Sequence, residues 1–424
     1  MQEQTLAIHA GYDNDSMGTM AVPLYQTTAF EFRDTEHAAD LFALKELGNI
    51  YTRLMNPTTD VFEKRFNALE HGGGAVGTAS GMAAIFYAIA NVAESDDNII
   101  VAKQVYGGTT TLTGHTIKRF GIETRYFNVN EPSEIEALVD DKTKIILFES
   151  ITNPSIDVAD FEAIVAIADK HNIITCVDNT VATPIYCKPL TLGCDVVVHS
   201  ASKYTTGQGL AIGGIIIERE NLVDKIKDNP RYAHFNEPDE SYHGLIYSDL
   251  PLPLFTLRVR LALLRDLGAT PSPFNSWLYI QGLETLPLRM RQHSSSALAV
   301  AKYLEAHPKV NRVNYPGLES NANYALAQKY FPKGQSGLLS FEVDTKEEAQ
   351  AIADATDIFK VVVNIGDSKS IITHPASTTH QQLSETELID AGIPAGLIRL
   401  SVGLEDTNDL IADLGKALGV TVCE

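Results

Sequence analysis

The chain has 424 residues, which is too long for one compact core, so two or three domains are expected. Its formal net charge is −21 and its isoelectric point is about 4.9. This acidity argues against nucleic acid or an anionic membrane surface as the main partner, because both require a basic field. Although 44% of the residues are hydrophobic, no apolar run approaches the roughly 20 residues that span a bilayer.

The four cysteines stand at positions 176, 187, 194 and 423 and form no CxxC pair. We do not expect a disulfide framework, because the chain is long and has few cysteines. The first residues, MQEQTL, have neither the basic region nor the apolar stretch of a secretory signal. We therefore expect a cytoplasmic chain in a reducing compartment.

Residues 1–60 are interrupted by Gly, Pro and Thr, which predicts an extended arm with one short helix at about 35–47. From about residue 60, apolar segments alternate with helical patterns. The predicted strands are 75–79, 98–102, 123–127, 144–148, 173–177, 196–199 and 213–217. The predicted helices are 60–69, 81–92, 109–120, 132–139 and 161–171. Near-continuous apolar strands separated by helices indicate a mostly parallel α/β sheet, which we assign to residues 61–268.

Residues 228–256 break this alternation with a polar, turn-rich stretch that is either a surface insertion or a loop shaping a site. A helix is predicted at about 254–267. The remaining residues, 269–424, predict a smaller α+β domain. Its predicted helices are 285–307, 346–355 and one from 407. Its predicted strands are 310–314, 337–343, 361–364 and 397–402.

The segment VVVHSASK at 196–203 is the most informative part of the chain. Its apolar strand is followed by two small hydroxyls, Ser200 and Ser202, and then by Lys203. A lysine just past a buried strand is easily desolvated, which favours the neutral, nucleophilic amine, and the hydroxyls could hold a phosphate. This pattern suits a lysine that forms a Schiff base with pyridoxal phosphate (PLP). A strand that ends in a solvated lysine is the alternative.

Two further features lie where strands end, the position at which open α/β sheets carry their functional groups. Ser80, Gly81 and Met82 stand at a strand-to-helix turn, where free N–H groups favour a phosphate. Asp178 ends the apolar run ITCVD and could face the pyridine nitrogen of PLP. An ordinary turn and a capping aspartate are the alternatives. Tyr106 and Glu149 also fall at strand ends.

Arginines provide two more candidates. Arg53, close to Tyr51 in the predicted arm, could bind phosphate across a subunit interface, or it could simply be exposed. Arg399 interrupts the apolar run LIRLSV and needs a partner, either a substrate carboxylate or a structural salt bridge.

Two other site classes are disfavoured. His374 and His380 do not have a recognised metal-ligand spacing, and no third ligand is evident, so no metal is predicted. The glycines at 207, 209, 213 and 214 do not form a GxGxxG motif after a strand, so no dinucleotide site is predicted.

The motifs YTRLMNPT, TASGM, VYGGT, ESITNPS, VDNT, HSASK, HPASTTH and RLSVG, in this order, resemble the Cys/Met-metabolism family of PLP enzymes, in its cystathionine γ-synthase-like branch. The resemblance covers essentially the whole chain. It implies an α/β PLP-dependent transferase of fold type I, similar to aspartate aminotransferase, with a mostly parallel central sheet and a smaller α+β C-terminal domain. It also implies a homotetramer built from two catalytic dimers, with residues 1–60 contributing to a neighbouring subunit.

The resemblance implies a role for each matching position. Lys203 would carry PLP and move protons, Asp178 would face the ring nitrogen, and Tyr106 would stack on the ring. Asn153 would contact the hydroxyl side of the cofactor. The implied phosphate ligands are Ser80, Gly81, Met82, Ser200 and Ser202, with Tyr51 and Arg53 completing the site of a neighbouring subunit. Arg399 would bind the substrate carboxylate, with Asn364 and Tyr51 nearby.

Within the branch, the insertion containing residues 237–244 and the run NIGD at 364–367 resemble O-acetylhomoserine sulfhydrylases. This implies conversion of O-acetyl-L-homoserine and sulfide, or a thiol, to L-homocysteine, or methionine, and acetate. The alternative activities are a methionine γ-lyase and a cystathionine γ-synthase type. Gly108 stands where some γ-lyases have cysteine, which weakens the lyase interpretation. Ser202 replaces a common threonine, and residues 205–208 depart from a common Gly-Gly-His pattern. A noncatalytic scaffold is a third hypothesis, disfavoured by the intact Lys203, Asp178 and Arg399.

Overall fold

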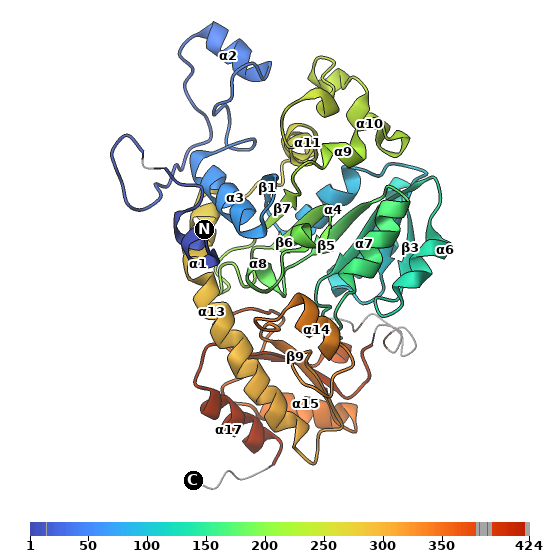
Figure 1. Cartoon of the computed structure of the whole chain (residues 1–424). Coiled ribbons are helices and arrows are strands. Elements are labelled where there is room, and N and C mark those ends of the chain that lie inside the picture. The colour runs from blue at the N-terminus through green and yellow to red at the C-terminus, as the bar shows by residue number, and fades with distance from the viewer. Residues whose placement is uncertain (14, 379–380, 382–387, 389–391, 420–424) are drawn as a thin grey trace.

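The computed structural model describes residues 1–13, 15–378, 381, 388 and 392–419. It contains two sheets that lie one above the other in Figure 1. The larger has seven strands in the order β1-β7-β6-β5-β4-β2-β3, and the smaller has five in the order β10-β11-β12-β9-β8. No helix among the described residues is long and apolar enough to cross a membrane.

The strands of the large sheet closely follow the predicted segments. They are β1 (Gly74–Thr78), β2 (Asn98–Ala102), β3 (Glu123–Phe127), β4 (Thr143–Glu149), β5 (Ile174–Asp178), β6 (Val196–Ser200) and β7 (Gly214–Glu218). Strands β2 to β6 pair in parallel, whereas β7 is antiparallel to both β1 and β6. The predicted mostly parallel sheet is therefore confirmed.

Helices cover both faces of this sheet. His199 of β6 packs against Phe66 of α3 (Pro57–Glu70), with ring centroids 4.6 Å apart. The next residue, Ser200, lies against Gly81 at the start of α4 (Gly81–Ala90). Since consecutive strand residues point to opposite faces, α3 and α4 lie on opposite sides of the sheet. Other helices of this part are α1 (Glu3–His9), α2 (Thr35–Phe42), α5 (Gly107–Thr111), α6 (Ile135–Leu138), α7 (Phe161–Lys170), α8 (Thr183–Tyr186), α9 (Val223–Ile226), α10 (Ala233–Asn236), α11 (Leu254–Arg258) and α12 (Arg265–Leu267).

The helix boundaries have local causes. Asn56 precedes α3 and accepts a hydrogen bond from the backbone N–H of Thr58, while Pro57 occupies the first helical position. His71 then ends the helix in a left-handed conformation, with φ of 58°. Asp160 caps α7 in the same way through the N–H of Ala163. These polar caps explain why the predicted helix ends are close to the observed ones.

The smaller sheet comprises β8 (Arg312–Asn314), β9 (Leu338–Glu342), β10 (Lys360–Val361), β11 (Ile371–Thr373) and β12 (Leu397–Ser401). The helices around it are α13 (Pro273–Glu305), α14 (Tyr324–Tyr330), α15 (Lys346–Ala355) and α17 (Thr407–Ala417). Strand β11 and helix α14 were not predicted. A second apolar cluster forms between this sheet and its helices, separate from the cluster around the large sheet. The domain limits 1–60, 61–268 and 269–424 stay predictions.

Helix α13 begins at Pro273, twelve residues before the predicted start at 285, which was wrong. Ser272 caps it through the N–H of Asn275, 3.1 Å away. Its interior Gly282 lies against the backbone of Thr205, where any Cβ would overlap the carbonyl oxygen. A tertiary contact therefore explains a glycine that weakens the helical pattern in the sequence. Figure 1 shows α13 running from beside α1 down to the C-terminal part of the molecule, next to α17.

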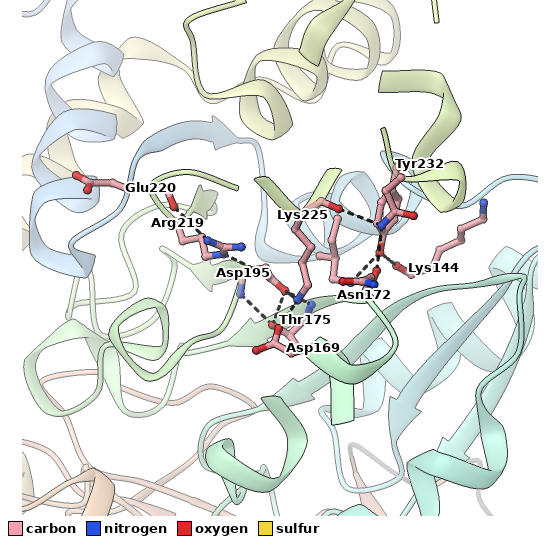
Figure 2. Close-up of polar contacts among 11 residues, drawn as sticks. Lys144, Asp169, Asn172, Thr175, Asp195, Arg219, Glu220, Lys225 and Tyr232 are labelled. Carbon is pink, nitrogen blue, oxygen red and sulfur yellow. Dashed lines mark hydrogen bonds and ion pairs between the residues drawn. The ribbon is translucent and has the colours of Figure 1, made fainter. Parts of the chain in front are cut away.

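The polar insertion at 228–256 docks at the amino edge of the large sheet, as Figure 2 shows around Tyr232. The Tyr232 hydroxyl donates to the carbonyl oxygen of Lys144 at 2.8 Å and accepts from the N–H of Ile174 at 2.7 Å. It therefore joins the starts of β4 and β5. Beside it, buried Asp195 accepts from Arg219 and Lys225 at 2.8 and 2.7 Å. The insertion is thus a structural addition at the amino ends of the parallel strands, opposite their carboxyl ends.

Candidate active site

A cavity of about 400 Å³ lies where the carboxyl ends of the parallel strands meet the C-terminal sheet. Predicted site residues from seven separate segments line it. They are Ser80, Gly81, Met82, Tyr106, Asn153, Asp178, Ser200, Ser202, Lys203, Asn364 and Arg399. The fold therefore brings together side chains more than 300 positions apart in the sequence.

One wall of the cavity is suited to a phosphate. Ser80 caps α4 by accepting the N–H of Ala83 at 3.0 Å, so the first turn of the helix faces this wall. Gly81 permits close approach of α4 to β6, since a Cβ there would lie 2.7 Å from Cβ of Ser200. The Ser202 hydroxyl accepts from the N–H of Gly213 at 3.0 Å, which fixes the turn before Lys203.

Two carboxylates lie side by side on neighbouring strands, because Glu149 of β4 pairs in register with Asp178 of β5. Asp178 accepts the backbone N–H of Thr180 at 2.9 Å. Burial raises the pKa of Asp178, against the opposing effects of its hydrogen bonds and of His199 and Lys203. Burial and the nearby Asp178 carboxylate raise the pKa of Glu149 well above its ordinary value. An added cation against Asp178, such as a protonated ring nitrogen, would favour its charged form.

Lys203 follows β6, and its amine donates a hydrogen bond of 2.7 Å to Oδ1 of Asn364. Burial, together with the nearby guanidinium of Arg399, lowers the pKa of Lys203 to about 8, although Asp178 opposes the change. A substantial share of the amine is therefore neutral near pH 8. The alternative of a solvated strand-end lysine does not fit this partly buried, hydrogen-bonded side chain.

Arg399 lies in β12 and is 4% exposed. It donates to Asn153 Oδ1 at 2.9 Å, to the carbonyl oxygen of Asn364 at 3.1 Å and to Thr373 Oγ1 at 3.3 Å. Burial lowers its pKa to about 10. Among the described residues its Nε has no hydrogen-bond partner and no carboxylate forms a salt bridge with it. The structural salt-bridge alternative is therefore not supported there, and the guanidinium retains a donor for an anion.

Tyr51 and Arg53 lie outside this cavity. Arg53 donates to the carbonyl oxygen of Arg265 at 2.6 Å, and its guanidinium lies 5.4 Å from the centre of the Tyr51 ring. Within one chain they therefore do not join the other predicted site residues. Their predicted contribution to a neighbouring subunit stays a prediction.

His374 is buried, and its ring nitrogens contact Ser377 Oγ and the carbonyl oxygen of Ala395, both at 2.7 Å. His380 lies outside the described residues. The part of the chain that the structure describes contains no cluster of three metal-ligating side chains.

Three residues that line the cavity or contact its lining were not assigned a role from the sequence. Thr180 accepts the N–H of Ser200 at 2.8 Å, joining the ends of β5 and β6. Thr373 supports Arg399, and Glu149 contacts the backbone of two other site residues. Glu149 directly follows a predicted strand, whereas Thr180 lies two residues past β5 and Thr373 belongs to β11, which was not predicted.

Residues 4–419 match the family described as Cys/Met metabolism PLP-dependent enzymes. The chain belongs to this family. It is 45% identical to an O-acetyl-L-homoserine sulfhydrylase of Leptospira meyeri, over 98% of this chain and 96% of the relative. It is 43% identical to a homocysteine synthase of Schizosaccharomyces pombe, over 98% of both chains.

A solved structure from Campylobacter jejuni, described as an O-acetylhomoserine (thiol)-lyase, superposes with a TM-score of 0.98 at 52% identity. The match covers 99% of this chain and 100% of the other, which holds N'-pyridoxyl-lysine-5'-monophosphate. These comparisons establish the expected fold and pyridoxal phosphate as the cofactor of the family.

The cavity of this chain fits that cofactor. It combines a helix N-terminus with a close glycine contact, the partly buried carboxylate of Asp178, and a lysine whose pKa is lowered to about 8. The unpaired Nε of buried Arg399 adds a donor that no described residue satisfies. These groups match a phosphate, a ring nitrogen, an aldehyde and a substrate carboxylate respectively.

Proposed function

We propose that the chain catalyses γ-replacement, in which sulfide or a thiol displaces acetate from O-acetyl-L-homoserine to give L-homocysteine or methionine. The observation that carries this proposal is the placement of Lys203 and Arg399 on one cavity, joined through Asn364. That arrangement supplies an amine for the reacting carbon and an unpaired donor for an amino-acid carboxylate. The near full-length likeness to O-acetyl-L-homoserine sulfhydrylases selects this reaction within the family.

The residues that would hold the cofactor follow from the cavity. Ser80, Gly81, Met82, Ser200 and Ser202 would bind its phosphate, Asp178 would face its ring nitrogen, and Tyr106 would stack on its ring. Asn153 would lie at the hydroxyl side. When bound, pyridoxal phosphate supplies an electron sink for the charge that develops at the substrate Cα.

The side chains of this protein would then orient the substrate and move its protons. The guanidinium of Arg399 would bind the α-carboxylate, with Asn364 alongside. The amine of Lys203 would take the proton from Cα and return protons later in the cycle, which requires a neutral amine near the working pH. Tyr106, at the cavity wall, would assist one of these transfers.

The deciding experiment is product analysis of purified, cofactor-loaded protein given O-acetyl-L-homoserine with and without sulfide. We expect homocysteine and acetate in equal amounts only when sulfide is present. Abundant 2-oxobutyrate and ammonia regardless of sulfide would instead assign a γ-lyase. Cystathionine formed efficiently from added cysteine, with little homocysteine from sulfide, would assign the cystathionine γ-synthase type.

We also propose that residues 1–60 form an arm that brings Tyr51 and Arg53 to the cavity of a neighbouring subunit in a homotetramer. Their position outside the cavity of their own chain supports this assignment. Mixing inactive Lys203→Ala chains with inactive Arg53→Ala chains should restore partial activity, because one mixed site per pair contains both native residues.

A further inference from the structure

Glu149 is a buried carboxylate at the cavity whose two oxygens hold two different site residues. It ends β4 and is 5% exposed. Its Oε1 accepts the backbone N–H of Tyr106 at 2.6 Å, and its Oε2 accepts the backbone N–H of Asn153 at 3.0 Å. No arginine, lysine or histidine forms a salt bridge with it among the described residues. The two backbone donors are thus its polar contacts in the described part of the chain.

The two residues that Glu149 holds face different parts of the proposed substrate complex. Tyr106 forms the wall proposed to lie against the cofactor ring. Asn153 accepts a hydrogen bond of 2.9 Å from Nη1 of Arg399, the proposed carboxylate ligand. Arg399 in turn donates to the carbonyl oxygen of Asn364, whose Oδ1 accepts from Lys203. Glu149 therefore stands at one end of a continuous network that reaches the lysine.

A carboxylate in this position is costly to bury, since it has no cationic partner and lies beside Asp178. Capping two loops would require only neutral acceptors. A carboxylate differs from an amide because both of its oxygens accept, so it can fix two N–H groups at one spacing. The geometry thus indicates that the site needs both backbone N–H groups, of Tyr106 and of Asn153, to be held by the same side chain.

We propose that Glu149 is a positioning residue that sets the Tyr106 wall and the Arg399 guanidinium at a fixed separation, the latter through Asn153. This deepens the proposed function and rests on it, because it assumes a cofactor ring at Tyr106 and a substrate carboxylate at Arg399. Glu149 itself touches neither reacting group in this scheme.

The test is Glu149→Gln, which keeps the shape but replaces one acceptor oxygen with an NH₂ group facing a backbone N–H. We expect the KM for O-acetyl-L-homoserine to rise about tenfold or more, because one of the two buried acceptor contacts is lost. Independently of turnover, the dissociation constant for pyridoxal phosphate should rise, and the visible circular dichroism of the bound cofactor should change. Glu149→Asp, which keeps both acceptors one methylene further back, should recover part of each property and replaces the Gln variant if that variant does not fold.

Glu218→Gln is a matched control. Glu218 is 1% exposed and ends β7, at the amino ends of the parallel strands and away from the cavity. Like Glu149, it accepts two backbone N–H groups, from Phe255 and Thr256 at 3.3 and 2.7 Å. Its substitution should change thermal stability while KM, cofactor affinity and dichroism stay unchanged. The positioning role would be overturned if Glu149→Gln behaved like this control, with only its stability altered.

A double-mutant cycle tests the link to Arg399. The KM increases of Glu149→Gln and Arg399→Lys should combine to less than their product, because both act on the same guanidinium. Strictly multiplicative effects would refute the connection through Asn153. If the native protein makes no homocysteine, the proposed reaction fails, whereas the cofactor affinity and dichroism of Glu149→Gln still decide whether this residue positions the Tyr106 wall.

Discussion

The amine of Lys203 and the side-chain oxygen of Asn364 are 2.7 Å apart, although one follows the large sheet and the other belongs to the C-terminal part of the chain. The backbone oxygen of Asn364 also accepts a hydrogen bond from Arg399. Asn364 therefore lies between two cations and offers an acceptor to each. This neutral link allows the lysine and the guanidinium to share one cavity without a carboxylate between them. Because Asn364 carries no negative charge, it does not offset the effect of Arg399, which lowers the pKa of Lys203.

Replacement of Lys203 with alanine should abolish turnover and the visible absorbance of the lysine-bound cofactor. The physical reason is that no other described lysine lines the cavity. Absorbance spectroscopy of the purified variant with added pyridoxal phosphate checks the cofactor, and the homocysteine assay checks the reaction. A coloured, active Lys203→Ala protein would show that Lys203 is not the lysine that binds the cofactor.

The capture of pyridoxal phosphate by cofactor-free protein should accelerate as pH rises, with a midpoint near pH 8. Only the neutral amine attacks the aldehyde, and burial lowers the pKa of Lys203 to about 8, so the neutral fraction increases through that pH. Stopped-flow absorbance measured from about pH 6 to about pH 10 gives the pH dependence of the capture rate. Arg399→Ala should move the midpoint to higher pH, because it removes a positive charge that lowers this pKa. A midpoint near 10.5 in the native protein would contradict the prediction.

Arg399→Ala should also raise the KM for O-acetyl-L-homoserine by about a hundredfold, with a smaller effect on kcat. Charge-assisted hydrogen bonds to a carboxylate are stronger than neutral ones, and alanine removes all of them at this site. Steady-state kinetics provide the measurement. Arg219→Ala is the control. Arg219 pairs with Asp195 at the amino ends of the parallel strands, away from the cavity, so its substitution should leave KM unchanged. Equal kinetics for the native and Arg399→Ala proteins would exclude the carboxylate role.

Gly81→Ala should weaken pyridoxal phosphate binding by about tenfold or more. The added Cβ would lie 2.7 Å from Cβ of Ser200 and 2.9 Å from its Cα, so α4 and β6 must separate and the phosphate wall widens. Equilibrium dialysis of the cofactor measures the change. Unaltered affinity in a folded variant would show that this close approach does not shape the phosphate site.

Tyr232→Phe should lower the free energy of unfolding by about 1–3 kcal/mol without altering kinetics. The hydroxyl satisfies the carbonyl of Lys144 and the N–H of Ile174, which would both lose their partner at the amino edge of the sheet. Urea unfolding and steady-state kinetics test the two parts. A changed KM would mean that the insertion communicates with the cavity.

The sequence by itself determined the strands of the large sheet, the family, and the strand-end positions of Asp178 and Lys203. Such features depend on local patterns: runs of apolar β-branched residues, capping side chains, and turns that follow them. The same local rules missed the first twelve residues of α13, which include Gly282, a poor helix former whose lack of a side chain is required by the contact with distant Thr205.

Only the tertiary structure decided which partners surround each functional group. Arg399 could have been a salt bridge or a carboxylate ligand, and the choice depended on Asn153, Thr373 and Asn364, which lie far away or on other strands. Glu149 had no role until its two oxygens were seen on Tyr106 and Asn153. The insertion could equally have covered the cavity. Burial and hydrogen bonding are set by what packs around a side chain, and residues near in space but distant in sequence leave no local pattern.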